Sequence, residues 1–268
     1  MSPSPRGGEG RGEGLTLHFR DEGEGSPIVP LHGLGASGRV FDPLFTKRVY
    51  RRLISVDLPR TARSGHWASS TPEHISAALL DFLDTRKVKA FELFGHSFVG
   101  LVALHLAATN AKRVTKLTVA STPAMGVPPE FKLLLANPLA DMTMGWFGRM
   151  PIWRPALKSY LQMIWGPSAN LNDEHLSLYE EALGAPGFSE GMLEALRAVA
   201  AFRTPVEALR GATFEKRVLW GEKDRLVSVV QGEQLALSIG AKLTVLHDVG
   251  HCLPEEAPDA LHEFLTAG

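Results

Sequence analysis

The sequence contains a single cysteine, Cys252, among its 268 residues, so no disulfide can form within the chain. Proteins of oxidising compartments often depend on disulfides, and their absence is typical of the reducing cytosol. We therefore expect a cytoplasmic location. Aromatic residues are also sparse, at 8%, although hydrophobic residues together reach 44%, the level of a folded globular protein.

The chain also lacks an excess of charge of either sign. Its 28 Lys and Arg residues are balanced by 29 Asp and Glu residues, which gives a formal net charge of −1. Surfaces that bind nucleic acids are usually strongly basic, so this balance argues against DNA or RNA as a partner. The histidines show no spacing typical of a metal site, and we expect neither a metal nor an organic cofactor.

Long apolar runs are missing as well. The longest, Phe98 to Ala108, is interrupted by His105, whereas a membrane-spanning helix needs about 20 apolar residues. Residues 1–14 are mainly Gly, Pro, Ser, Arg and Glu, and they lack the apolar core of a signal peptide. We therefore predict no membrane span and a disordered tail over residues 1–14.

Apolar runs of strand length alternate with helical patterns along much of the chain. Thr71 followed by Pro72, for example, predicts the start of a helix. Strands that alternate with helices build mostly parallel sheets through right-handed crossovers. We predict strands at residues 15–21, 28–31, 53–56, 91–94, 114–120, 217–220 and 243–246, and helices at residues 40–51, 72–85, 98–109, 229–239 and 255–265.

This alternation stops after Pro123. Between residues 123 and 208 the patterns are helical, and no segment has the pattern of a strand. An insertion of about 85 residues is far longer than an ordinary connection, which indicates a functional segment. Large apolar residues are frequent in its first half, among them Met142, Trp146 and Trp153.

Ser97 lies at the sharpest transition in the pattern. The strand-like run that ends at Phe94 leads through Gly95 and His96 to this serine, and a helix-like run follows at once. A serine on such a strand-to-helix turn is typical of a nucleophile elbow, which exposes the hydroxyl group. The pattern predicts Ser97 as a nucleophile, and a serine nucleophile requires a base and an acid elsewhere in the chain.

Two later residues meet that requirement. Asp224 follows the predicted strand that ends at Trp220. In the same way, His251 follows the predicted strand that ends at Leu246. Side chains at the carboxyl ends of parallel strands meet at one edge of the sheet. Because an imidazole can take the serine proton and a carboxylate can orient the imidazole, we predict His251 as the base and Asp224 as the acid, with Glu222 as a weaker rival.

Two backbone N–H groups are predicted to complete the site, because the charge on an attacked carbonyl oxygen needs hydrogen-bond donors. One is that of Phe98, directly after the predicted nucleophile. The other comes from the turn at residues 32–35, His-Gly-Leu-Gly, which follows an earlier strand. We assign it to Leu34, because a glycine on either side lets the backbone approach a ligand closely.

Four segments jointly resemble the α/β-hydrolase superfamily. They are the turn at residues 32–35, Asp57-Leu58-Pro59 with Arg63-Ser64-Gly65, the serine elbow, and Gly221-x-x-Asp224 with Gly250-His251. The resemblance implies an α/β fold, with a doubly wound, mostly parallel sheet and a core formed by residues 15–122 and 209–268. It also implies that residues 123–208 form an inserted helical cap over the active site.

Three departures from the family pattern lie near the predicted site. The elbow has Val99 where the family usually has a glycine, which implies a displaced helix or a repacked neighbour. The loop at residues 59–64 lacks two glycines and a histidine that the family often carries. Pro30 removes a backbone donor from a predicted central strand. Each departure could alter substrate choice or activity.

The resemblance implies a serine hydrolase that cleaves a carboxylic ester or lactone with a mainly apolar group through an acyl-enzyme. A thioesterase, an acyltransferase, a carbon–carbon hydrolase or lyase, and a ligand receptor with a vestigial site remain open alternatives. Epoxide-hydrolase and dehalogenase chemistry is disfavoured, because those relatives carry an aspartate at the elbow. The sequence does not define an oligomeric state. The expected substrate-binding residues are His96, Met142, Trp146, Trp153 and Leu226.

Overall fold

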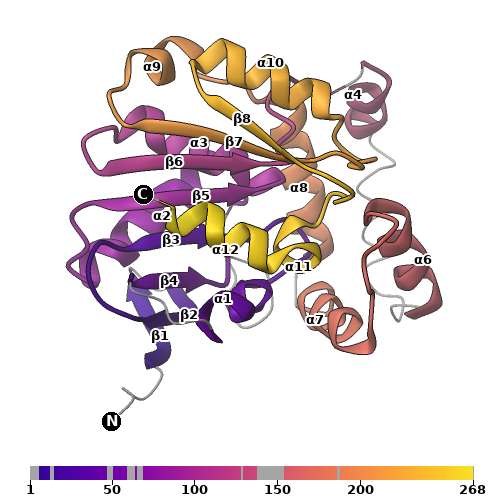
Figure 1. Cartoon of the computed structure of the whole chain (residues 1–268), viewed down its shortest axis with the longest axis horizontal. Coiled ribbons are helices and arrows are strands. Elements are labelled where there is room, and N and C mark those ends of the chain that lie inside the picture. The colour runs from indigo at the N-terminus through magenta and orange to yellow at the C-terminus, as the bar shows by residue number, and fades with distance from the viewer. Residues whose placement is uncertain are drawn as a thin grey trace.

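An eight-stranded sheet organises the chain, with helices on both of its faces (Figure 1). The strand order is β1-β2-β4-β3-β5-β6-β7-β8. The computed structural model describes residues 6–12, 15–46, 51–58, 64, 69–127, 129–137, 154–185 and 188–267. The strands are β1 (Arg6–Gly12), β2 (Leu15–Glu22), β3 (Ile28–Leu31), β4 (Leu53–Val56), β5 (Phe91–His96), β6 (Val114–Ala120), β7 (Glu215–Gly221) and β8 (Lys242–Leu246).

The pairing is antiparallel between β1 and β2 and between β2 and β4, and it is parallel from β4 through β8. This is the predicted, mostly parallel sheet of an α/β fold. The helices are η1 (Gly38–Phe41), α1 (Asp42–Thr46), α2 (Pro72–Thr85), α3 (Phe98–Thr109), α4 (Pro129–Ala136), α6 (Arg154–Ile164), α7 (Asp173–Leu183), α8 (Phe188–Ala201), α9 (Val206–Gly211), α10 (Val229–Ile239), α11 (Leu253–Glu256) and α12 (Pro258–Thr266).

Two apolar layers, one on each face of the sheet, bury the parallel strands. Along β5, Phe91 and Leu93 belong to the layer that includes α2, α3 and α10, while Phe94 belongs to the layer with α1 and α12. On β7, Trp220 belongs to the layer with α2, α3 and α10, and Leu219 belongs to the layer with α1 and α12. Neighbouring side chains of a strand point to opposite faces, so strands covered on both faces are almost continuously apolar.

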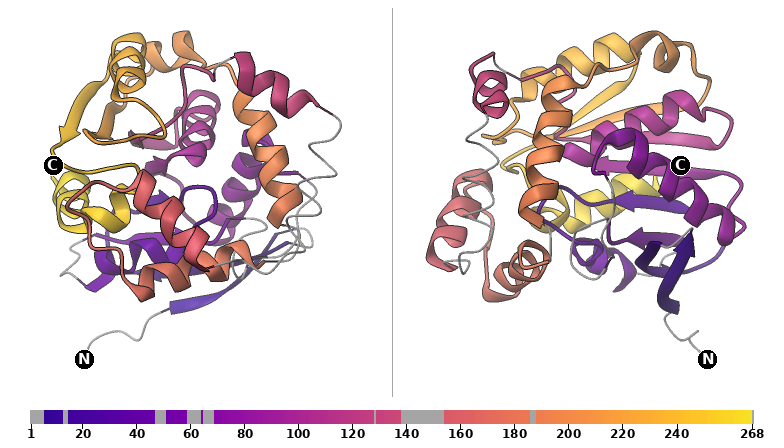
Figure 2. Two further views of the ribbon diagram at one scale, coloured as in Figure 1. Left: turned by 90° about the vertical axis from the view of Figure 1, so that its right-hand side faces the viewer. Right: turned by 180° about the vertical axis from the view of Figure 1, so that it is seen from behind.

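Helices α4, α6, α7 and α8 all lie beyond the carboxyl ends of the parallel strands (Figures 1 and 2). They belong to the insertion at residues 123–208, whose described part contains helices and no strand. Helix α8 packs against both α3 and α4, and α6 packs against α7. The insertion therefore covers the edge of the sheet at which the predicted site residues were expected to meet.

Three predicted elements differ from the structure. Residues 6–12, expected within a disordered tail, pair with β2 as strand β1, since backbone hydrogen bonds to an edge strand need no apolar side chain. The helix expected over residues 255–265 is divided into α11 and α12 at Pro258, which has no N–H group to continue the hydrogen-bond ladder. The helix expected from residue 40 begins as the 3₁₀ turn η1 and continues as α1 to Thr46.

Pro30 lies in the central strand β3, as the sequence implied. The pairing of β3 with β4 is restricted to one residue pair, Ile28 with Leu53, whereas its pairing with β5 runs along the whole strand. The N–H of Ile28 donates to the carbonyl of Arg52, the residue before β4, and the next residue that would donate on that side is Pro30. Beyond it, the His32 ring accepts a hydrogen bond from the N–H of Leu58, over 2.9 Å, and bridges the gap between the two strands.

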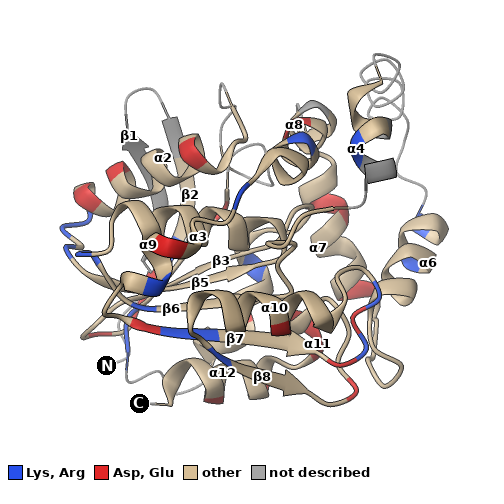
Figure 3. Cartoon of the chain, turned by 90° about the horizontal axis from the view of Figure 1, so that it is seen from above, with Lys and Arg blue, Asp and Glu red and all other residues tan. Residues whose placement is uncertain are grey.

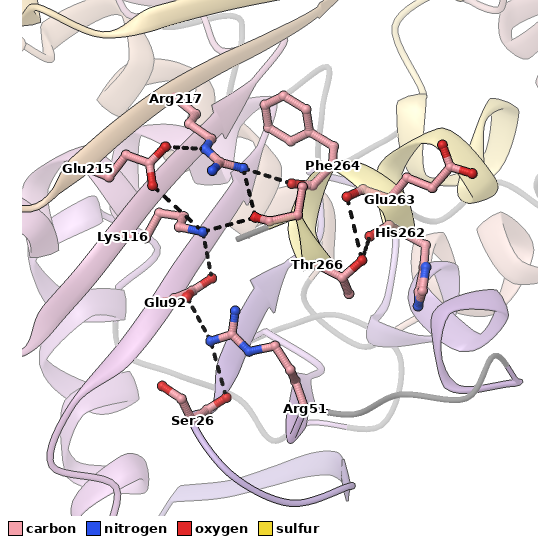
Figure 4. Close-up of polar contacts among 11 residues, drawn as sticks. Ser26, Arg51, Glu92, Lys116, Glu215, Arg217, His262, Glu263, Phe264 and Thr266 are labelled. Atoms are coloured by element: carbon pink, nitrogen blue, oxygen red, sulfur yellow. Dashed lines mark hydrogen bonds and ion pairs between the residues drawn. The ribbon is translucent and has the colours of Figure 1, made fainter.

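Lys and Arg residues are interspersed with Asp and Glu residues along the coloured part of the ribbon (Figure 3). At the amino-terminal ends of β5, β6 and β7 they form a network under α12 (Figure 4). The ammonium group of Lys116 lies 3.7 Å from both Glu92 and Glu215. Arg217 donates to Glu215 over 2.6 Å and to the carbonyl of Phe264 over 3.0 Å. These cations face the carboxyl end of α12, where the helix dipole favours positive charge.

Candidate active site

Ser97 forms the turn between β5 and α3, with φ 55° and ψ −132°. A positive φ is costly for a residue other than glycine and persists only where surrounding structure holds it. Two glycines allow α3 to pack closely on the strands. A Cβ on Gly95 would lie 2.6 Å from the Cβ of Ala103, and a Cβ on Gly100 would lie 1.9 Å from Oγ1 of Thr122. The helix therefore packs tightly on the sheet although residue 99 is a valine.

The three residues predicted as nucleophile, base and acid lie in one chain of hydrogen bonds. Oγ of Ser97 lies 2.9 Å from Nε2 of His251, and Nδ1 of His251 lies 2.9 Å from Oδ2 of Asp224. The other carboxylate oxygen of Asp224 accepts the N–H groups of Leu226 and Val227, over 2.9 and 2.8 Å. The carboxylate is thereby fixed so that Nδ1 donates to it and Nε2 can accept the serine proton.

Both backbone groups of His251 are held by other parts of the fold. Its N–H donates over 2.8 Å to the carbonyl of Ile164, the last residue of α6. Its carbonyl accepts a hydrogen bond from Nε2 of His96 over 2.7 Å. Burial and the neighbouring His251 lower the pKa of His96 to about 3, so this ring is neutral. His96, expected to bind substrate, is buried and supports the backbone of His251.

Glu256 is a further carboxylate at the site, and the sequence reasoning did not identify it. Its Oε2 accepts the N–H groups of Gly250, over 2.8 Å, and of Gly166, over 2.6 Å, while Oε1 accepts that of Cys252 over 2.8 Å. Burial raises the pKa of Glu256, and the three N–H donors oppose that effect. An acidic residue in the helix that follows His251 was the only signal in the sequence for this anchor.

The two predicted oxyanion donors are available for a ligand. The N–H of Leu34 donates no hydrogen bond within the described part of the chain. Phe98 is the first residue of α3, and the N–H groups at the start of a helix have no acceptor within it. Gly33 lies against Ser97, since a Cβ there would be 3.3 Å from Cβ of Ser97. The preceding His32 ring is buried, and burial lowers its pKa.

A pocket of about 30 Å³ opens beside these donors. Of the expected substrate-binding residues, Leu226 has a side chain that is 49% exposed and lies outside the pocket lining. Met142, Trp146 and Trp153 fall outside the described residues. The pocket is lined by His32, Gly33, Leu34, Leu58, Ser70, Ile75, Phe98, Val99, Phe188, Gly191, Met192 and Ala195.

A second buried cluster lies behind the His251 loop. The hydroxyl of Tyr179 donates to Glu255 over 2.6 Å and lies 3.4 Å from Sγ of Cys252. Burial raises the pKa of Glu255 to about 8, and it also raises the pKa of the Cys252 thiol. A buried thiol with a raised pKa stays protonated, and a neutral thiol is a poor nucleophile.

Within the described residues, each helix is too short or too polar to cross a bilayer. In the same ranges, no three His, Cys, Asp or Glu side chains are grouped so that they could hold a metal ion.

The chain matches the family model described as "Alpha/beta hydrolase family" over residues 28–264. It is 33% identical over 129 residues to a protein named pimeloyl-acyl-carrier-protein methyl ester esterase from Vibrio vulnificus (strain CMCP6), a match that covers 47% of this chain and 49% of the relative. The match thus spans about half the length of this relative.

Two solved structures have the same architecture. A thermophilic esterase from Thermogutta terrifontis superposes with a TM-score of 0.81 at 21% identity, covering 97% of this chain and 96% of that one. The enol-lactonase from Burkholderia xenovorans LB400 gives a TM-score of 0.74 at 21% identity, covering 94% and 96%. At these identities the likeness establishes the fold.

Proposed function

Because this chain belongs to the alpha/beta hydrolase family, we propose that it is a serine hydrolase that cleaves a carboxylic ester or lactone with a mainly apolar group. The observation that carries the proposal is the chain of hydrogen bonds from Ser97 through His251 to Asp224. The esterase and lactonase names of the relatives support the choice of an ester or lactone as substrate.

In the proposed reaction, Oγ of Ser97 attacks the ester carbonyl while Nε2 of His251 takes its proton. Asp224 orients the imidazole and stabilises the cation that forms. The N–H groups of Leu34 and Phe98 donate to the carbonyl oxygen as it becomes negative. His251 then passes its proton to the leaving alcohol oxygen, which releases the alcohol and leaves an acyl group on Ser97.

The second half of the reaction regenerates the enzyme. Water attacks the acyl carbon while His251 takes one of its protons, and the proton then returns to Oγ of Ser97 as the carboxylic acid leaves. Every proton that moves is carried by His251, so activity should fall in acid as this ring becomes an imidazolium and can no longer accept the serine proton.

The insertion at residues 123–208 is proposed as the cap of the site. Gly35 of the oxyanion turn supports this role, because a Cβ there would lie 3.4 Å from Leu183 on α7 and 3.8 Å from Phe188 on α8. A covered site keeps bulk water away and strengthens the electrostatic contacts within it. A small-molecule substrate and the cytoplasmic location inferred from the single cysteine are part of the same proposal.

The proposal is tested by hydrolysis of p-nitrophenyl butyrate and by labelling with a fluorophosphonate. Wild-type protein should turn over the ester steadily and gain the mass of one phosphonyl group. Ser97→Ala should abolish both, and Asp224→Asn should lower kcat by about 10³–10⁴-fold. Ser76→Ala is the control, because Ser76 is a buried serine that lies on α2 and donates to the carbonyl of Val102. Equal hydrolysis by Ser97→Ala and wild type would refute the proposal.

A further inference from the structure

The pocket beside the oxyanion donors lies between the turn that follows β3 and the start of α3. It is bordered by Gly33, Leu34 and Phe98, which surround the expected position of the carbonyl oxygen. His251 does not line it. The leaving oxygen of an ester must face His251, because Nε2 returns the proton to it. The group that extends into the pocket is therefore the acyl group, and this assignment rests on the proposed function.

The described residues that line the pocket are mainly apolar. Helix α8 contributes Phe188, Met192 and Ala195, and none of the described lining residues is charged. His32 is the only described lining residue with ring nitrogens, and both nitrogens form hydrogen bonds. Nδ1 lies 2.9 Å from the carbonyl oxygen of Gly33, and Nε2 accepts the N–H of Leu58. A free carboxylate on the acyl group would be desolvated there without a cation, so the walls select a neutral group.

Val99 forms part of the pocket wall in the first turn of α3, together with Ile75 of α2. Its side chain is 2% exposed and belongs to the packed core on that face. The tight packing of α3 on β5 uses Gly95 and Gly100, so the two methyl groups of Val99 are free to narrow the pocket. A cavity of about 30 Å³ holds roughly two to three groups the size of a methylene or a water.

Ser70 is the polar exception in the lining. It is 6% exposed, and its hydroxyl forms no hydrogen bond with any described residue. The adjacent residues are both engaged: Ser69 donates to Glu194 over 2.6 Å, and Oγ1 of Thr71 lies 2.9 Å from Nδ1 of His74. Its oxygen is not one of the fully enclosed polar atoms, so it keeps some accessible surface, and a polar ligand atom in the pocket can form a hydrogen bond with it.

We propose that this pocket selects a short, neutral acyl group that carries a hydrogen-bonding atom. Val99 limits the length of the group, and Ser70 binds the polar atom, which is a hydroxyl or carbonyl oxygen. Both residues determine specificity and have no part in the proton transfers.

The role of Val99 is tested with p-nitrophenyl esters of acetate, butyrate, hexanoate and octanoate. Wild type should prefer acetate or butyrate. In Val99→Ala the ratio of kcat/KM for hexanoate to that for acetate should rise by about tenfold or more, since one or two methylene groups in an apolar pocket discriminate by at least that factor. Val102→Ala removes the same two methyl groups from the same helix, outside the pocket lining, and should leave the ratio unchanged.

The role of Ser70 is tested with p-nitrophenyl esters of 3-hydroxybutyrate and 4-oxopentanoate, compared with butyrate and pentanoate. Wild type should prefer at least one substituted ester over its unsubstituted counterpart. Ser70→Ala should erase that preference, measured as the ratio of kcat/KM between the two esters of each pair, and Ser76→Ala should keep the preference.

The outcomes separate this inference from the proposed function. If wild type hydrolyses none of the esters, the proposed function fails first. If Ser97→Ala abolishes hydrolysis but Val99→Ala keeps the wild-type length profile, the assignment of Val99 is wrong. If wild type has no preference for a substituted ester, or Ser70→Ala retains that preference, the assignment of Ser70 is wrong.

Discussion

The carboxylate of Glu256 accepts a hydrogen bond from the N–H of Gly250 over 2.8 Å, one residue before His251. Its second oxygen accepts the N–H of Cys252, one residue after His251. The same carboxylate also binds the N–H of Gly166, which follows α6. One side chain therefore fixes the loop that carries the imidazole and joins that loop to the insertion.

Replacing Glu256 should lower the turnover rate more than substrate affinity. In Glu256→Gln one of the three N–H groups faces an amide N–H₂ instead of an oxygen, so the His251 loop loses a hydrogen bond. A displacement of the base by about 1 Å can cost about a hundredfold in rate. We expect kcat for p-nitrophenyl butyrate to fall about 10–100-fold while KM changes little.

Steady-state kinetics over a range of ester concentrations measure both parameters. Glu263→Gln, an exposed change on α12, is the control and should retain wild-type kcat. A Glu256→Gln protein that melts at a lower temperature but keeps the full kcat would indicate that the carboxylate supports the fold alone.

The positions of Asp224 and His251 followed from the sequence because they depend on local order. Each comes directly after an apolar run, and a parallel sheet brings the carboxyl ends of such runs to one edge. The sharp turn at Ser97 was likewise predicted by the abrupt change from a strand pattern to a helix pattern. These features require no knowledge of how distant segments pack.

Other features depend on packing between distant segments, and the sequence did not reveal them. Glu256 meets Gly166 across 90 positions of the chain. The direction of the His96 ring is set by its hydrogen bond to a residue 155 positions away. Val99 was interpreted as a disturbance of helix packing, yet Gly95 and Gly100 preserve that packing. A periodic pattern identifies which face of an element is buried but not which partner covers it.

Glu255 should make stability depend on pH. Its folded-state pKa is raised to about 8 from an ordinary value of 4.5, mainly by burial, and its buried Oε2 has no hydrogen-bond partner. Between these values the folded protein holds a proton that the unfolded chain releases. The stability contributed by the neutral carboxyl is therefore complete below about pH 4.5 and is lost as pH rises through about 8.

Glu255→Gln removes that titration while it keeps an acceptor for Tyr179. We expect the melting temperature of this variant, relative to wild type, to rise steadily from pH 5 to pH 8 in thermal unfolding experiments. Glu263→Gln should remain parallel to wild type over the same range. A constant difference between Glu255→Gln and wild type would mean that Glu255 is ionised in the folded protein.

Gly250 should tolerate no side chain, because the His251 loop and the chain after α6 approach each other through their backbones. A Cβ on Gly250 would lie 2.3 Å from the N of Gly166 and 2.6 Å from the carbonyl oxygen of Ile164. Backbone atoms cannot move aside as the end of a flexible side chain can. Gly250→Ala should therefore displace His251 and destabilise the protein by about 1–3 kcal/mol.

Gly211→Ala provides the matched control for this substitution. A Cβ at Gly211, the last residue of α9, meets nothing within 4 Å. The change should be neutral, or stabilising by up to about 1 kcal/mol, because alanine restricts the unfolded chain. Urea unfolding and ester hydrolysis measured on both variants test the comparison. The N–H of His251 donates to the carbonyl of Ile164 over 2.8 Å, which requires close contact between this loop and the end of α6. Wild-type stability and kcat in Gly250→Ala would contradict that close contact.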